Sequence, residues 1–296
     1  MIPPSQVSVS APAKINLALH VTGQRDDGYH LLETLAVFTR FGDTIEIMPA
    51  SEDSFHAFGP YSADVPVGRD NIVAQARDLF KTRTDLDMPV AITLEKRLPV
   101  ASGIGGGSSD AAATLIALNT LAGTDMDVGA LAELGTKLGA DVAMCVHRAP
   151  LVAKNIGDMV TAVRPFPRLH VVLVNSGVQI STPRVFSGLT NRANSPLPEI
   201  PSRFATDELD RWLAATRNDL TAAAVRLDPE IETVAERLVD AGARFARMSG
   251  SGATCFGIFD SAQHARQAAA TIVERHLGWF VVATETTAHG DQYEPD

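Results

Sequence analysis

Glycine, serine and aspartate crowd one short segment of the chain, residues 103–110, which reads GIGGGSSD. Glycine has no Cβ, so a run of glycines lets the backbone take positive φ angles and approach a ligand closely. Backbone N–H groups that point inward bind phosphate, and the positive end of a following helix adds to the attraction. The segment therefore predicts a binding loop for a polyphosphate, because a plain tight turn needs only one or two glycines.

Two common phosphate-binding loops do not match this segment. A Walker A loop has a lysine after its glycines, and no lysine follows Gly107. A dinucleotide fingerprint has a third glycine where this chain has Ser108, and it begins its domain instead of lying roughly 90 residues in. The hydroxyls of Ser108 and Ser109 stand at the first turn of the expected helix, where they can bond phosphate oxygens or hold Mg²⁺.

Two charged residues are candidates for chemistry on a phosphoryl group. Asp141 follows Gly139 and Ala140 at an expected helix end and precedes an apolar run, so it is a candidate general base. Lys14 lies on or just before an otherwise apolar strand, where an ammonium can steady developing negative charge. Ordinary interpretations stay open for both: a surface aspartate at a helix end, and an edge-strand lysine that discourages aggregation.

Hydrophobic periodicity predicts the elements that must position these residues. Alternation predicts strands over 15–22, 44–47 and 90–95, and further strands are expected over 169–174, after Gly242, over 255–259 and near 279–284. Helical spacing predicts helices over 72–81, 109–122, 127–138, 207–227, 230–241 and 261–276. Residues 31–41 indicate a strand, with a helix as the open alternative, whereas 53–69 and 191–201 indicate irregular loops.

Three segments together resemble the motifs of the GHMP kinases, a superfamily that includes galactokinase, homoserine kinase and mevalonate kinase. Residues 98–112 are similar to its central phosphate-binding motif, 11–17 to its N-terminal motif and 249–254 to its third motif. The resemblance implies a two-domain α+β fold, with an N-terminal ATP-binding domain over 1–160 and a C-terminal substrate-side domain over 161–296. The strand–loop–strand–helix–strand order near the C-terminus favours a ferredoxin-like arrangement of the second domain.

Further segments narrow the resemblance to one branch of the family. Residues 22–30, 41–45, 138–142 and 218–220 are similar to the branch whose acceptor is a cytidine-diphosphate-linked methylerythritol, in non-mevalonate isoprenoid synthesis. This implies transfer of phosphate from ATP to the 2-hydroxyl of that acceptor, with Mg²⁺ arriving with ATP. Ala143 departs from the pattern, which has proline there, and Ile104 replaces a more usual leucine.

The resemblance also assigns roles to single residues. It implies that Lys14 and Asp141 are catalytic. We assign no protein ligand to Mg²⁺, with the hydroxyl of Ser108 as the one candidate. Contacts to ATP are expected at Asn71, Pro99, Val100, Ala101, Ser102, Gly103, Ile104, Gly105, Gly106, Gly107, Ser108 and Ser109. Contacts to the acceptor are expected at Asn16, Tyr29, His30, Phe186, Gly250 and Ser251, with the base stacked on aromatic rings. Structural interpretations stay open: a helix cap for Asn71, a core side chain for Phe186, and a β-turn for residues 250–252, the second glycine loop.

Composition excludes several other classes. The chain of 296 residues has 35 acidic and 25 basic residues, a net charge of −10, which argues against nucleic acid as a partner. No run approaches the roughly 20 apolar residues of a membrane span, and the first ten residues lack a secretory pattern. Cys145 and Cys255 are expected to be reduced and buried, and the histidines lack a zinc-ligand spacing. We expect a cytoplasmic enzyme whose oligomeric state the sequence leaves open.

Three alternatives stay open. One is another GHMP kinase, acting on homoserine or a sugar, although such acceptors have no base to stack on Tyr29 and His30. Another is a nucleotide-binding module without catalysis, which the presence of both Lys14 and Asp141 disfavours. The third is a dinucleotide-dependent oxidoreductase, which Ser108 and the position of the loop disfavour.

Overall fold

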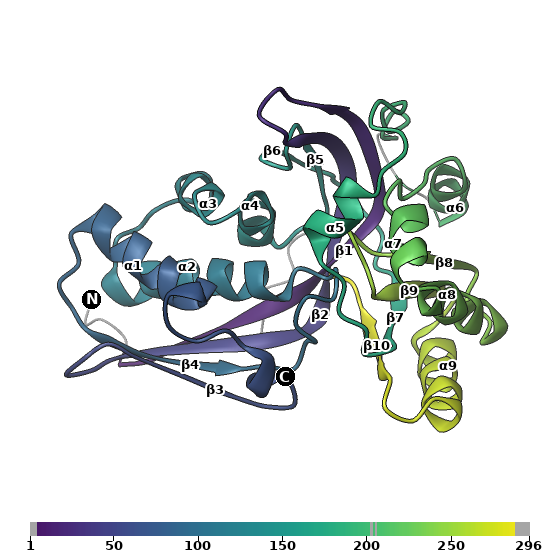
Figure 1. The fold of residues 1–296 in the computed structure, drawn as a ribbon. Helices are drawn as coiled ribbons and strands as arrows, with labels where there is room; N and C mark the ends of the chain where they lie inside the picture. The colour runs from purple at the N-terminus through teal and green to yellow at the C-terminus, as the bar shows by residue number, and fades with distance from the viewer. Residues whose placement is uncertain (1–4, 202–203, 205, 288–296) are drawn as a thin grey trace.

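Figure 1 shows the computed structural model, which describes residues 5–201, 204 and 206–287. Within these residues the chain forms two sheets, each with helices packed on it. The outermost residues of the two predicted domains, 1–4 and 288–296, lie outside this range. No helix in the described part of the chain is both long and apolar enough to cross a membrane.

The first sheet is built on two long antiparallel strands, β1 (Val7–Gln24) and β2 (His30–Pro49). Its order is β3-β4-β2-β5-β6, with β1 paired to β2 outside this path. The remaining strands are β3 (Ser54–Phe58), β4 (Val90–Glu95), β5 (Leu151–Lys154) and β6 (Met159–Ala162). The strands predicted over 31–41 and 44–47 are therefore one continuous strand, and the helical alternative for 31–41 is wrong.

Four helices belong to this first half: α1 (Ile72–Thr84), α2 (Gly106–Ala122), α3 (Val128–Thr136) and α4 (Ala140–His147). Figure 1 shows them on one side of the sheet, with α2 in the middle. Helix α2 contacts β1, β2, α1, α3 and α4, and most of its side chains are buried. The small side chains along α2 allow this close approach of its neighbours, while its first residues line the cleft described below.

The second sheet has the order β10-β7-β9-β8, and all its pairs are antiparallel. Its strands are β7 (His170–Asn175), β8 (Phe245–Met248), β9 (Cys255–Phe259) and β10 (Phe280–Glu285). Helix α8 (Glu230–Asp240) precedes β8 and α9 (Ala262–Arg275) precedes β10. Helix α8 lies in the connection from β7 to β8, and α9 connects β9 to β10. With these two helices, the strands of the second half therefore have the β-α-β-β-α-β order of the predicted ferredoxin-like domain.

The two halves share a hydrophobic core. Ile15 and Leu17 of β1 pack in one cluster with Leu173 of β7 and Phe256 of β9, and all four are fully buried. Residues 163–169 connect the two sheets, and the predicted boundary after residue 160, which lies inside β6, stays a prediction. Because β1 contributes to both cores, the two halves hold a fixed orientation along it.

Several elements differ from the sequence-based predictions. The predicted loop 53–69 contains β3 and two short 3₁₀ turns, because its alternating residues pair with β4. The single helix predicted over 207–227 is two, α6 (Thr206–Ala214) and α7 (Thr221–Leu227). It breaks where the backbone of Arg217 and Asp219 bonds to Leu19 of β1. The helix α4, the β5–β6 hairpin and the short helix α5 (Thr182–Ser187) complete the fold.

Candidate active site

A cleft of about 980 Å³ lies between the two halves of the molecule. Its walls come from β1, β2, the loop before α2, the start of α4, helix α5 and the loop between β8 and β9. Fifteen of the predicted site residues line it: Lys14, Asn16, Tyr29, His30, Ala101, Ser102, Gly103, Gly105, Gly106, Gly107, Ser108, Asp141, Phe186, Gly250 and Ser251. Residues from all three resembling motifs therefore meet in one place, which sequence spacing alone cannot establish.

The glycine loop before α2 has the backbone geometry that its composition predicts. Gly103 has φ 78° and Gly105 has φ 67°, both in the left-handed region that favours glycine. A Cβ on Gly103 would lie 2.5 Å from the carbonyl oxygen of Gly252, so the two glycine loops touch backbone to backbone. Helix α2 begins at Gly106, earlier than the predicted Ser109, and its first N–H groups lack partners within the helix.

Backbone bonds tie this loop to β1 and to the second glycine loop. The N–H of Lys14 donates to the carbonyl of Ile104 at 2.8 Å. The hydroxyl of Ser249 donates to the carbonyl of Gly103 and accepts from the N–H of Asn16, each at 3.1 Å. These bonds cross between both halves of the protein, so the loop is a rigid part of the cleft wall.

Lys14 and Asp141 form an ion pair in the cleft, with Lys14 Nζ 2.9 Å from Asp141 Oδ2. The lysine side chain is 4% exposed and the carboxylate 48% exposed. Asn16 Oδ1 accepts a second bond from the ammonium at 3.2 Å, and Asn16 Nδ2 donates to Thr34 Oγ1 at 2.8 Å. Asp141 stands in the first turn of α4, where the helix dipole favours a negative charge. The pair thus places a solvent-accessible carboxylate beside an ammonium that Asn16 holds in position.

Aromatic residues form another part of the cleft. The His30 and Phe186 rings lie 4.9 Å apart, tilted by 35°, and Tyr29 is an exposed neighbour. Burial and then the charge of Arg192 lower the pKa of His30, which favours a neutral imidazole. His30 Nε2 is buried without a hydrogen-bond partner in the described part of the chain. His30 thus adds an unpartnered ring nitrogen to the residues that line the cleft.

Five predicted ATP contacts do not line the cleft: Asn71, Pro99, Val100, Ile104 and Ser109. Asn71 caps α1, because its Oδ1 accepts from the N–H groups of residues 73 and 74, and its Nδ2 donates to the carbonyl of Pro66. The Ile104 side chain is fully buried in the shared core and Ser109 is buried beneath the loop. The structure thus gives Asn71 and Ile104 structural positions, and any contact they make to a nucleotide stays a prediction.

A second lysine centre, which the sequence reasoning missed, lies under the glycine loop. Lys96 Nζ is 2.6 Å from Asp43 Oδ2 and 2.6 Å from Asp110 Oδ2, and no member is more than 3% exposed. Asp43 Oδ1 accepts from the N–H groups of Arg97 and Leu98. Burial would lower the pKa of Lys96, but the two carboxylates outweigh it and raise that pKa. Charged residues at the ends of otherwise apolar segments were the available signal.

Arg192 also lines the cleft and was not among the expected site residues. It lies in the segment 191–201, which the sequence indicates only as a proline-rich surface loop. The described part of that segment is indeed without helix or strand. No local motif distinguishes this arginine from those of the solvent-facing surface.

Comparisons with protein families and curated proteins give matches over most of the chain. The model of the GHMP kinases N terminal domain matches residues 71–149, and that of the GHMP kinases C terminal matches 205–277. A protein of Brucella melitensis biotype 1, named 4-diphosphocytidyl-2-C-methyl-D-erythritol kinase, is 52% identical over 281 residues, covering 93% of this chain and 94% of its own. A protein of Rhizobium meliloti with the same name is 46% identical over 291 residues, covering 96% and 97%.

Solved structures share the architecture. A crystal structure of 4-(cytidine 5'-diphospho)-2C-methyl-D-erythritol kinase matches with a TM-score of 0.78 and 32% identity, covering 95% of this chain and all of its own. A homoserine kinase from Cytophaga hutchinsonii matches with a TM-score of 0.68 over 96% of this chain and 95% of its own, at 18% identity. At that identity the second likeness concerns the fold alone.

Proposed function

Since the chain belongs to the GHMP kinase family, we propose that it transfers the γ-phosphoryl group of ATP to the 2-hydroxyl of 4-diphosphocytidyl-2-C-methyl-D-erythritol. It is a phosphotransferase with an alcohol acceptor. The observation that carries the proposal is one cleft that combines a phosphate-binding loop, the Lys14–Asp141 pair and an aromatic pocket at His30 and Phe186. The likeness to relatives of the same printed name supports the choice of acceptor.

The catalytic pair is suited to proton transfer from an alcohol. As the acceptor oxygen attacks the γ-phosphorus, its proton passes to the open carboxylate of Asp141. The bond from the γ-phosphorus to the bridging oxygen breaks, and ADP leaves with that electron pair. Lys14, held by Asn16, keeps the carboxylate in place and offsets negative charge that gathers near the transferred group.

The glycine loop is suited to the phosphates of ATP. Unpaired N–H groups at the start of α2 and the hydroxyl of Ser108 face the cleft, and no side chain at 103 or 105–107 blocks a phosphate. When bound, Mg²⁺ neutralises charge on the phosphates. The described residues hold no group of three or more acidic, histidine or cysteine ligands. We therefore expect the nucleotide to supply most metal ligands, with Ser108 as the protein hydroxyl beside it.

The aromatic pocket supports a nucleoside end on the acceptor. A cytosine can stack against Phe186 or Tyr29, and the unpartnered Nε2 of His30 can bond its polar edge. Ser251, bonded to Thr182 Oγ1 at 2.8 Å, joins the second glycine loop to the start of α5 on the same wall. Homoserine or a sugar would leave this pocket unfilled, which disfavours those acceptors.

ADP release from the purified protein tests the proposal directly. With Mg-ATP, we expect rapid turnover with 4-diphosphocytidyl-2-C-methyl-D-erythritol and at least 100-fold lower kcat/KM with homoserine, mevalonate or galactose. Removal of Mg²⁺ with a chelator should abolish turnover. Preference for an acceptor without a cytidine group would contradict the proposed function. The two domains at 1–160 and 161–296 and a cytoplasmic location stay predictions beside it.

A further inference from the structure

One positively charged side chain that lines the cleft, that of Arg192, has no role in the mechanism described above. Among the described lining residues, the lysines and arginines are Lys14 and Arg192, whereas Asp27 and Asp141 bring negative charge. Lys14 already bonds Asp141 and Asn16. The proposed acceptor carries a diphosphate between its base and its polyol, on a protein with a net charge of −10. Such an anion needs a local positive group, because the overall charge repels it.

Arg192 is well placed to supply that positive group. Arg192 lines the same cleft as His30 and Phe186. Burial first, and then the charge of Arg192, lower the pKa of His30. The ion pairs and side-chain bonds found among the described residues give Arg192 no carboxylate partner. An arginine that lines a cleft with its donors unused offers a planar fork that matches phosphate oxygens.

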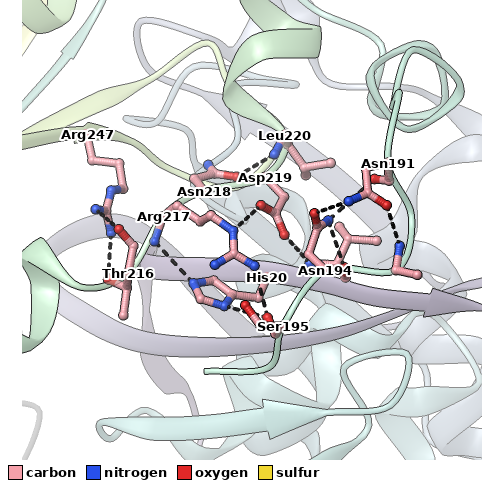
Figure 2. Close-up of polar contacts among 12 residues, drawn as sticks. His20, Asn191, Asn194, Ser195, Thr216, Arg217, Asn218, Asp219, Leu220 and Arg247 are labelled. Atoms are coloured by element: carbon pink, nitrogen blue, oxygen red, sulfur yellow. Dashed lines mark hydrogen bonds and ion pairs between the residues drawn. The ribbon is translucent and has the colours of Figure 1, made fainter. Parts of the chain in front are cut away.

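The backbone on both sides of Arg192 is held by local bonds. Asn191 Nδ2 donates to Asn194 Oδ1 at 2.7 Å, and Asn191 Oδ1 accepts from the N–H of Ala193 at 3.0 Å. Asn194 donates to the carbonyl of Val21 on β1 from both its backbone N–H and its Nδ2, each at 3.0 Å. Figure 2 shows this segment lying against the strand.

A second set of contacts fastens the same segment to β1 (Figure 2). The carbonyl of Ser195 lies 3.0 Å from His20 Nδ1 and accepts from Arg217 Nη2 at 2.9 Å. His20 Nε2 accepts from the N–H of Arg217 at 3.1 Å, so Nδ1 carries the ring proton and donates to Ser195. Asp219 completes the set, because its carboxylate accepts from Arg217 Nε at 2.6 Å and from the N–H of Val21 at 2.7 Å.

We propose that Arg192 binds the diphosphate of a nucleoside-diphosphate-linked acceptor, and that its anchored segment holds the backbone of this residue beside the cleft. The proposal rests on the proposed function and names the part of the acceptor that this residue recognises. Since the segment is fastened to the strand that also carries Lys14 and Asn16, little backbone freedom is lost when the anion binds. Arg192 is then a specificity residue for the linkage, beside the aromatic residues that select the base.

Calorimetric binding of cytidine and of cytidine diphosphate tests this assignment without relying on turnover. In the unaltered protein we expect the diphosphate to bind more tightly than the nucleoside. In Arg192→Gln we expect the Kd for cytidine diphosphate to rise roughly 10- to 100-fold, as when a charged hydrogen bond is lost, with the Kd for cytidine within about twofold. Arg192→Lys should fall between, because it keeps the charge without the fork.

Arg184→Gln is the matched control, since it removes an equal charge from the exposed surface of α5, beside the cleft but outside its lining. It should bind both ligands as the unaltered protein does. In turnover, Arg192→Gln should raise KM for the acceptor and leave KM for ATP unchanged. Equal weakening of cytidine and cytidine diphosphate, or a raised KM for ATP, would overturn the assignment. If the acceptor is not phosphorylated at all, the proposed function fails, while the two Kd values still decide on Arg192.

Discussion

Two lysine–carboxylate centres lie on either side of the glycine loop, and they differ in their access to water. Lys14 pairs with one carboxylate, Asp141, which is 48% exposed in the cleft. Lys96 pairs with two, Asp43 and Asp110, in a centre that is almost entirely buried. The same kind of ion pair is thus offered to a substrate on one side and sealed inside the protein on the other.

Two adjacent glycines of the loop each lie against one of the two lysines. A Cβ on Gly105 would lie 3.1 Å from Cε of Lys14, and a Cβ on Gly106 would lie 3.2 Å from Nζ of Lys96. An exposed carboxylate can exchange a protein partner for a substrate hydroxyl at small cost, whereas a buried one that loses its partner leaves an uncompensated charge. The solvent exposure of the carboxylates therefore decides which centre can react with a substrate and which one stabilises the loop.

The largest expected effect comes from removing the base of the open centre. Asp141→Asn should lower kcat by about 10³-fold, equal to about 4 kcal/mol, because the acceptor proton then has no carboxylate to receive it. The free energy of unfolding should change by less than about 1 kcal/mol, because the carboxylate is half exposed and Lys14 keeps its bond to Asn16. Steady-state kinetics and urea unfolding measure both quantities. Asp78→Asn, which breaks the surface pair with Arg77, should leave kcat unchanged.

Breaking the buried centre of Lys96, Asp43 and Asp110 should instead affect the free energy of unfolding more than kcat. Lys96→Met should lower the free energy of unfolding by about 3–5 kcal/mol, because two carboxylates stay buried without their cation. Lys81→Met, which breaks the surface pair with Asp53, should cost no more than about 1 kcal/mol. Adding Asp110→Asn to Lys96→Met should restore part of the loss, since Asp43 keeps its two backbone donors. A Lys96→Met protein as stable as the unaltered one would contradict the comparison.

The two glycines allow a sharper test within one loop. Gly105→Ala should lower kcat by roughly tenfold, because alanine at φ 67° costs about 1–2 kcal/mol and its methyl group crowds Lys14. Gly106→Ala has no such φ and crowds Lys96 instead, so it should act mainly on the urea midpoint. The same pattern of loss in both variants would show that the loop responds as one unit.

The smallest expected effect concerns the surplus carboxylate of the sealed centre. Asp110 Oδ1 has no hydrogen-bond partner among the described residues, and burial raises the pKa of Asp110 well above its usual value. Asp110→Asn should therefore be neutral or stabilising, by about 1 kcal/mol at pH 7. Urea unfolding at pH 7 measures this difference.

The pH dependence of stability separates Asp110 from the other carboxylates. Between about pH 3.9, where an unfolded aspartate titrates, and the raised pKa of Asp110, the folded protein holds the extra proton. The contribution of Asp110 to the free energy of unfolding therefore falls as pH rises through that window. Unfolding curves across the window should show that Asp110→Asn lacks this component. An identical pH profile in both proteins would rule out a raised pKa.

The sequence predicted a large part of the fold and the centre of the site, because those signals are local. Glycines between a strand and a helix predict a phosphate loop, and period-two alternation predicts β4. The prediction failed where distant segments compete with local preference. Helical spacing continues across Asn218, yet its Nδ2 bonds the carbonyls of Met248 and Gly250, and the helix breaks there.

By itself the sequence determined the loop, most of the longer strands and helices and the family resemblance, since each depends on neighbours along the chain. Only the tertiary structure decided that Lys14 meets Asp141 across 127 residues while Lys96 is buried against Asp43 and Asp110. It likewise brought Arg192 to the cleft. The physical reason is that exposure and charge pairing depend on which distant strands and helices pack together, and no spacing in the sequence encodes the distance between them.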